Sequence, residues 1–145
     1  MAAESTANAV WEGDLAHGGG RVAPGSGAFE EQEVTWASRT SRSAGKTSPE
    51  ELIAAAHAAC YAMALSHTLA EGGHTPERVE VSAKATFETE GGPRIASMDL
   101  SVRGRVPGID ESAFQEAANA AKDGCPVSGA IKGNVEIRLD ATLES

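Results

Sequence analysis

Cysteine, aromatic residues and positive charge are all scarce in this chain of 145 residues. Only two cysteines are present, and in a reducing cytosol a permanent structural bridge between them is not expected. Aromatic residues make up only 4%, so the core must be built mainly from Ala, Val, Leu and Ile. The net charge of −9 gives an acidic surface that repels phosphates and anionic lipids. Nucleic acids and membranes are therefore not expected as partners.

The sequence also shows no recognisable leader, membrane span or cofactor motif. Met1–Val10 lacks the basic start and the apolar run of a signal peptide, and no stretch is expected to supply the roughly 20 apolar residues of a span. Phosphate-binding glycine loops, zinc-protease motifs and serine-hydrolase elbows are absent. We predict one cytoplasmic domain over residues 1–145, with no cofactor and no metal.

Residues 1–47 show short strand-like pieces rather than helical periodicity. Ala9–Trp11, Gly20–Val22 and Glu33–Trp36 are separated by turns rich in Gly and Ser. The polar segment Ser38–Thr47 is predicted to be a mobile loop, and it carries the cations Arg39, Arg42 and Lys46.

A long helix is predicted over Glu50–Glu71. Ser48 can cap it, Pro49 suits its first position, and Glu51 would complete a capping box. Gly72-Gly73 ends the pattern. One apolar stripe comprises Leu52, Ala56, Ala59 with Cys60, Met63 and His67. Further alanines surround the stripe, so we expect burial on more than one side.

The rest of the chain predicts an α+β fold. Alternating apolar residues indicate strands over 79–87 and 98–106 joined as a hairpin, and a final strand over 135–143. Asp110 can cap a helix over Glu111–Lys122, and Pro126 can open another that continues to about Lys132. The predicted order is β-β-β-α-β-β-α-α-β, with helices packed on antiparallel sheet.

The two cysteines are the strongest candidates for chemistry. In a reducing cytosol a disulfide is more often transient and catalytic than structural. Cys60 lies within an apolar helix, where burial raises a thiol pKa, so a reactive Cys60 needs a nearby cation or donor. His57, one turn away, and the arginines of the polar loop could serve. Cys125 precedes a helix start, where backbone N–H groups favour a thiolate.

Three other interpretations of these residues remain open. The cysteines could be inert packing in a non-catalytic protein that binds a small lipid-like ligand. Cys60, Cys125 and His57 could bind zinc with one more ligand, although the spacing is poor for it. A thiol-dependent hydrolase would need His57 as its base.

Four segments together resemble a known family. They are Trp11–Leu15, Ser48–Leu65, Val106–Asp110 and Gly124–Ser128, and they occur in the family's order across nearly the whole chain. The sequence resembles the OsmC/Ohr family of osmotically inducible and organic-hydroperoxide-resistance proteins. The residue His57 indicates similarity to the OsmC branch, because Ohr-like members commonly have Tyr there.

The resemblance implies a cysteine-based peroxidase that forms an intertwined homodimer. By match to the family's motifs, Cys60 would be the peroxidatic cysteine and Cys125 the resolving one. The substrate would be an organic hydroperoxide and the reductant a dithiol such as dihydrolipoamide. We expect Cys60 to form a sulfenic acid that Cys125 converts to a disulfide.

The resemblance also implies an arginine and a glutamate in the site. The glutamate matches Glu50, and the arginine matches Arg39, with Arg42 and Arg21 as rivals. Glu50 and Cys60 lie ten residues apart on one predicted helix, about 15 Å along its axis. If Glu50 acts at Cys60, we therefore expect it to come from a partner subunit.

Overall fold

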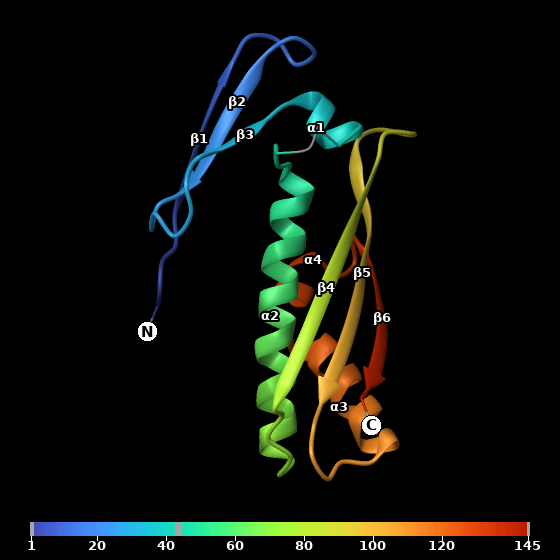
Figure 1. Cartoon of the computed structure of the whole chain (residues 1–145). Coiled ribbons are helices and arrows are strands. Elements are labelled where there is room, and N and C mark those ends of the chain that lie inside the picture. The colour runs from blue at the N-terminus through green and yellow to red at the C-terminus, as the bar shows by residue number, and fades with distance from the viewer. Residues whose placement is uncertain (1, 43–44, 145) are drawn as a thin grey trace. The chain divides into compact units, whose positions relative to one another are not determined.

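The computed structural model describes residues 2–42 and 45–144 and contains two compact units, Met1–Leu52 and Ile53–Ser145. Each unit has its own three-stranded sheet (Figure 1). The elements in chain order are β1 (Ala7–Glu12), β2 (Gly19–Pro24), β3 (Gln32–Val34), α1 (Trp36–Thr40), α2 (Pro49–Glu71), β4 (Arg78–Glu88), β5 (Arg94–Arg105), α3 (Glu111–Gly124), α4 (Pro126–Ile131) and β6 (Glu136–Leu143). The predicted α+β class is confirmed.

The first unit is an antiparallel sheet in the order β1-β2-β3. The predicted strand pieces fall within these strands, apart from the residues after Val34. Gly20 is the second residue of β2, where an added Cβ would come 2.6 Å from the Val10 carbonyl oxygen. Glycine is therefore needed here for the two strands to approach each other.

The short helix α1 was not predicted, and it corrects the expectation of a loop for Ser38–Thr40. Thr35 and Ser38 form a reciprocal capping box, with side-chain to backbone bonds of 3.0 and 2.9 Å. The Ser38 hydroxyl also donates to the Thr47 carbonyl at 2.7 Å, and Ser38 is only 1% exposed. Hydrogen bonding thus fixes both ends of the segment, while Ser43 and Ala44 lie outside the described residues.

Helix α2 begins at Pro49, as the sequence predicts. The Ser48 hydroxyl accepts the Glu51 N–H at 3.1 Å, which is half of a capping box. The Glu51 carboxylate does not complete the box as expected. It accepts instead from the Thr47 hydroxyl at 2.7 Å and from Arg42 at 2.8 Å.

The buried face of α2 differs from the predicted stripe. Its buried residues in the second unit are Ala54, His57, Tyr61, Leu65 and Leu69. Met63, expected on the buried stripe, is 73% exposed. The helix is apolar on most sides, so periodicity alone could not select a face. The bulkiest side chains, Tyr61, Leu65 and Leu69, determine which one packs in the core.

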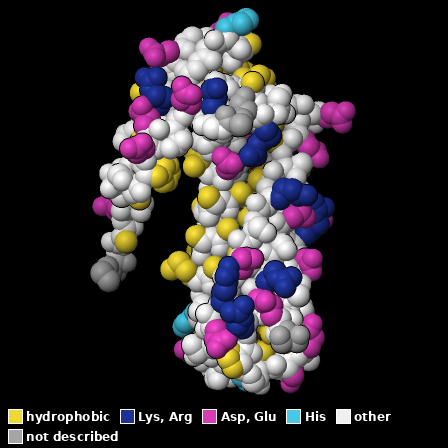
Figure 2. All heavy atoms as spheres, in the orientation of Figure 1, with side chains coloured by type: hydrophobic (Ala, Val, Ile, Leu, Met, Phe, Trp, Pro, Cys, Tyr) yellow, Lys and Arg dark blue, Asp and Glu magenta, His cyan; other side chains and the backbone are white. Residues whose placement is uncertain are grey.

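Within the second unit, much of the remaining surface of α2 is not covered by the other residues that the structure describes there. Hydrophobic side chains form a column over the helix (Figure 2). The helix is long and apolar enough to cross a membrane, although only 22% of its most apolar window is buried. The expectation that no stretch has this length is therefore wrong. A core helix meets the same criterion, and α2 contributes Tyr61, Leu65 and Leu69 to the main hydrophobic core.

The second unit places α2 alongside a sheet in the order β4-β5-β6 (Figure 1). Met98, Leu100 and Val102 of β5 face the core, as predicted. Strands β4 and β5 form the expected antiparallel hairpin, but β6 pairs with β5 in parallel. The sheet is therefore mixed rather than wholly antiparallel. Helices α3 and α4 form the crossover that a parallel neighbour requires.

Helix α3 packs closely on β5. Asp110 caps it, accepting the Ala113 N–H at 2.8 Å as the sequence predicts. Phe114 is fully buried, and its ring lies over Gly104 of β5. An added Cβ on Gly104 would come 2.6 Å from the Phe114 Cε1 atom.

We therefore expect Gly104→Ala to destabilise the protein by about 1–3 kcal/mol, because a packed aromatic ring cannot move aside. The free energy of unfolding from urea denaturation measures this effect. Gly129→Ala in α4, where an added Cβ meets nothing within 4 Å, is the matched control and should not lower stability. Equal effects of the two substitutions would contradict this packing argument.

Candidate functional site

The two cysteines meet in the second unit. Cys60 lies midway along α2, and Cys125 lies between α3 and α4. Their sulfur atoms are hydrogen-bonded to each other, and both cysteines are free thiols. Cys125 is 1% exposed, whereas Cys60 is partly accessible. The fold therefore brings together two sulfurs that are far apart in sequence, and it leaves Cys60 as the one that solvent can reach.

The position of Cys125 follows from the junction of two helices. The residue is at once the C-cap of α3 and the N-cap of α4, with an extended backbone at φ −69° and ψ 125°. Pro126 at the first position of α4 fixes this turn. The N–H groups of Val127 and Ser128 then donate to the Cys125 sulfur. These are first-turn amides, which have no partner within a helix.

The two thiols differ in their affinity for a proton. Burial raises the pKa of Cys60, its hydrogen bond to Cys125 raises it further, and a hydrogen bond from the Val127 N–H offsets this rise only in part. Burial also acts to raise the pKa of Cys125. It is outweighed by the Ser128 N–H, the Cys60 thiol, the Ser128 hydroxyl and the Val127 N–H, so the pKa of Cys125 is lowered. Within this unit, a thiolate is therefore favoured on Cys125, and the Cys60 thiol donates a hydrogen bond to it.

His57 lies one turn before Cys60 and is fully buried. Its Nε2 atom is 2.8 Å from the Ser128 hydroxyl oxygen. Its Nδ1 atom is buried without a hydrogen-bond partner among the described residues, which costs about 1–3 kcal/mol. Burial lowers the pKa of His57, so the ring is neutral at physiological pH. The sequence singled out His57 but missed Ser128, whose only signal was its place in Gly124–Ser128.

The arginine and glutamate matched by resemblance lie together in the first unit. Arg39 Nε donates to both Glu50 carboxylate oxygens at 3.1 Å, and Arg39 Nη2 donates at 2.9 Å. The Glu50 side chain is only 6% exposed and that of Arg39 is 32% exposed. A fork-like contact of this kind fixes the guanidinium plane.

The two rival arginines have different surroundings. Arg42 pairs with Glu51 at 2.8 Å, and Arg21 pairs with Glu31 at 3.0 Å. Both arginines are at least half exposed, so solvent weakens these pairs. Of the three arginines, Arg39 is the one held by a buried carboxylate.

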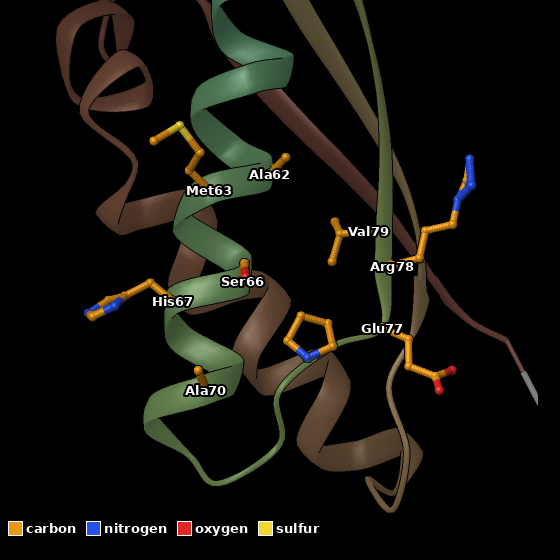
Figure 3. Close-up of a pocket in the computed structure, with 9 residues that line it drawn as sticks. Ala62, Met63, Ser66, His67, Ala70, Glu77, Arg78 and Val79 are labelled. Atoms are coloured by element: carbon orange, nitrogen blue, oxygen red, sulfur yellow. The ribbon is translucent and has the colours of Figure 1, made fainter.

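A hollow of about 450 Å³ lies next to Cys60. Its lining residues come from α2, α3 and the start of α4 and are mostly apolar: Cys60, Met63, Ala64, His67, Thr68, Ala121, Gly124 and Pro126. A second hollow of about 540 Å³ lies between α2 and the start of β4, and Met63 and His67 border it as well (Figure 3). The first hollow offers an apolar molecule direct access to the Cys60 sulfur.

The zinc interpretation finds no matching cluster in the part of the chain that the structure describes. Across residues 2–42 and 45–144, no group of three or more His, Cys, Asp and Glu side chains is placed to hold a metal ion. The site in hand consists of two sulfurs, a neutral imidazole and a hydroxyl.

Comparison with known proteins places the sequence among peroxidases and resistance proteins. A family model described as OsmC-like protein matches residues 42–140. The chain is 41% identical to Peroxiredoxin OsmC of Escherichia coli, and the match covers all of both proteins. It is 33% identical to the organic hydroperoxide resistance protein OhrB of Bacillus subtilis, over 65% of this chain and 68% of that protein.

Solved structures agree with these matches. The crystal structure of Bacillus subtilis OhrB has a TM-score of 0.71 and 26% identity, covering 94% of this chain and 98% of that one. An OsmC-like protein from Mycoplasma pneumoniae has a TM-score of 0.75 over the whole of both chains, and at 16% identity it supports the fold alone. The chain belongs to the OsmC-like protein family, as its sequence motifs predicted.

Proposed function

We propose that this protein is a thiol peroxidase that reduces organic hydroperoxides to alcohols. The observation that carries the proposal is the direct contact of Cys60 and Cys125, one accessible and one buried, with unequal proton affinities. A cysteine pair that only packs a core has no need of such donors around one sulfur. The relatives named peroxiredoxin and organic hydroperoxide resistance protein support the same chemistry.

The proposed reaction has three steps. A proton moves from Cys60 to the Cys125 thiolate, and the Cys60 thiolate attacks the terminal oxygen of ROOH. The O–O bond breaks, RO⁻ takes a proton from solvent and leaves as alcohol, and Cys60 becomes a sulfenic acid. Cys125 then loses its proton and attacks the Cys60 sulfur. A disulfide forms and the displaced hydroxide leaves with that proton as water.

Arg39 is the proposed source of positive charge. Because the second unit alone raises the pKa of Cys60, its thiolate needs a cation to form. A guanidinium stays charged and can bind both a thiolate and a peroxide oxygen. Glu50, buried against Arg39, is proposed to hold that guanidinium in place.

We further propose that the active form is a homodimer. Glu50 and Cys60 share α2, with about 15 Å between their positions along the axis. The Arg39–Glu50 pair of one subunit is therefore proposed to serve the Cys60 of its partner. Support comes from the uncovered apolar surface of α2, on which Met63 is 73% exposed.

The substrate and reductant follow from the surroundings of Cys60. The mostly apolar hollow beside this residue favours an organic peroxide over hydrogen peroxide. The disulfide would be reset by an external dithiol of the lipoyl type, attacking the accessible Cys60 sulfur.

A cytoplasmic location remains our prediction for the whole protein.

Mass spectrometry after one equivalent of cumene hydroperoxide tests the proposal. We expect the intact protein to lose a pair of hydrogens and a Cys60–Cys125 peptide to appear after digestion. Cys125→Ser should instead gain one oxygen on Cys60 and reduce a single equivalent of peroxide, because no thiol remains to resolve the sulfenic acid.

The same measurement distinguishes the peroxidase from the rival function. A non-catalytic protein that binds a lipid-like ligand would keep both thiols after treatment with the peroxide. Binding of the unreactive alcohol to the hollow, without loss of thiol from the wild-type protein, would favour that rival.

A further inference from the structure

The buried contact between His57 and Ser128 has no role in the peroxidase steps above. His57 is fully buried and Ser128 is 3% exposed, and their side chains meet at 2.8 Å across α2 and α4. The contact joins residues far apart in sequence and leaves His57 Nδ1 buried without a partner among the described residues. A buried polar atom left unsatisfied calls for an explanation. The ring nitrogen that has a partner, Nε2, contacts Ser128, and Ser128 in turn interacts with Cys125.

The protonation state of the pair follows from counting donors and acceptors. A neutral imidazole carries one N–H, on either Nε2 or Nδ1. If Nε2 carries the proton, it donates to the Ser128 oxygen, and the hydroxyl proton is free to bind the Cys125 sulfur. If Nδ1 carries it, the hydroxyl must donate to Nε2. Cys125 then loses that donor, and a buried N–H is left without an acceptor.

We propose that His57 and Ser128 are positioning residues that aim a hydroxyl donor at Cys125: His57 Nε2–H holds the Ser128 oxygen, and the Ser128 hydroxyl donates to the sulfur. The role rests on the proposed peroxidase function, in which Cys125 resolves the oxidised Cys60. Neither residue touches the hydroperoxide. Their effect is on whether Cys125 is ready as a thiolate when the sulfenic acid appears.

We call the two hydrogen bonds from His57 to Ser128 and from Ser128 to Cys125 the donor relay. It acts in both halves of the catalytic cycle. In resolution, a stabilised Cys125 thiolate attacks the Cys60 sulfur, forming the disulfide and expelling hydroxide, which becomes water. In recovery, the dithiol attacks the accessible Cys60 sulfur, and Cys125 leaves as the thiolate. A leaving thiol with a low pKa departs faster. The oxidant is the hydroperoxide and the reductant is the dithiol, so the relay itself is unchanged over the cycle.

The other groups that act on Cys125 carry no net charge at neutral pH. From α2, Cys60 and Tyr61 interact with Cys125, and both carry protons at neutral pH. Burial raises the pKa of Tyr61 strongly, and its hydroxyl donates to the Ala118 carbonyl at 2.9 Å. From α4, the interaction comes from the backbone of Val127 and from Ser128. Removing the Ser128 hydroxyl should therefore give a measurable change in the pKa of Cys125.

Thiolate absorbance in the Cys60→Ser background, where Cys125 is the remaining thiol, tests the relay without any peroxide. We expect Ser128→Ala to raise the pKa of Cys125 by about one unit and His57→Leu to raise it by part of that amount, because a hydrogen bond to a charged group is lost. Ser128→Thr and His57→Gln, which keep a donor at each place, should restore most of the shift. Unchanged pKa values in both donor-free variants would overturn the proposal.

One matched control variant and one further measurement separate the relay from general damage. Ser97→Ala removes another buried serine hydroxyl, one that accepts from Arg138, and should leave the pKa of Cys125 unchanged. In the otherwise unmodified protein, Ser128→Ala should still form the Cys60 sulfenic acid but close the disulfide about 3–4-fold more slowly at neutral pH, because fewer Cys125 thiolates are present and the higher nucleophilicity of each compensates only in part. If the wild-type protein forms no sulfenic acid with the hydroperoxide, the peroxidase function itself is refuted.

The tautomer of His57 gives a test that needs no substitution. Nitrogen-15 chemical shifts of the imidazole in the reduced wild-type protein should show a protonated Nε2 and an unprotonated Nδ1. A ring protonated on Nδ1 would overturn the relay, because the Ser128 hydroxyl would then point away from the sulfur.

Discussion

Cys60→Ser should abolish hydroperoxide reduction, lowering kcat/KM by at least ~10³-fold, because a serine hydroxyl does not attack the O–O bond as a thiolate does. The substitution is conservative in size and retains a hydrogen-bond donor toward Cys125. The fold should therefore survive, and circular dichroism with thermal unfolding checks this. Consumption of cumene hydroperoxide with excess dithiol measures the loss.

Met63→Leu is the matched control for Cys60→Ser. Met63 lines the same hollow and carries the other sulfur there, which peroxide can also oxidise. We expect Met63→Leu to retain turnover, because a thioether cannot resolve with Cys125. Full turnover by Cys60→Ser would show that the chemistry does not proceed through Cys60.

Arg39→Met should reduce kcat/KM by about 10²–10³-fold, because the cation proposed to stabilise the Cys60 thiolate and the breaking O–O bond is lost. Removing Arg39 also leaves the buried Glu50 carboxylate without its fork-like partner. Some loss of stability should accompany the loss of rate. The pH profile of the oxidation step should move to higher pH, because the Cys60 thiolate becomes harder to form.

The other two arginines are the controls for Arg39→Met. Arg42→Met and Arg21→Met remove exposed guanidinium groups paired with Glu51 and Glu31. Exposed pairs contribute little, so both variants should keep at least about half of the activity. If Arg42→Met is the inactive variant, the assignment of the active-site arginine moves to Arg42.

Mixed dimers test which subunit supplies the arginine. Cys60→Ser and Arg39→Met chains are each expected to be inactive alone. If Arg39 serves the partner's cysteine, a mixed dimer has one complete site. A random equal mixture should then recover about a quarter of the wild-type activity. Co-expression with two different tags prepares the mixture, and no recovery would place Arg39 and Cys60 of one site on the same chain.

Local signals in the sequence predicted most of the elements. Pro49 opens α2, Asp110 caps α3, and Pro126 opens α4, because each depends on residues only a few positions away. The alternating apolar residues of β4, β5 and β6 were equally clear. The missed helix α1 also has a local signal, the Thr35–Ser38 capping box, which the many small polar residues around it concealed.

Other features depended on packing between distant segments. The buried face of α2 was mispredicted because the helix is apolar on most sides, and the packing of its bulkiest side chains in the core decides which side is covered. The parallel pairing of β6 depends on the path of the chain through α3 and α4. The donor set around Cys125 includes the Ser128 hydroxyl, whose link to His57 spans two helices and has no signature in sequence spacing.

The sequence by itself determined the acidic, α+β character of the protein, its membership of a peroxidase-related family and the identity of its two thiols. Residue type and short-range order are sufficient for these conclusions. Only the tertiary structure decided that Cys60 and Cys125 share a hydrogen bond, that burial raises the pKa of Cys60, and that nearby donors lower the pKa of Cys125. Proton affinity depends on burial and on nearby donors, and the folded chain supplies both from residues far apart in sequence.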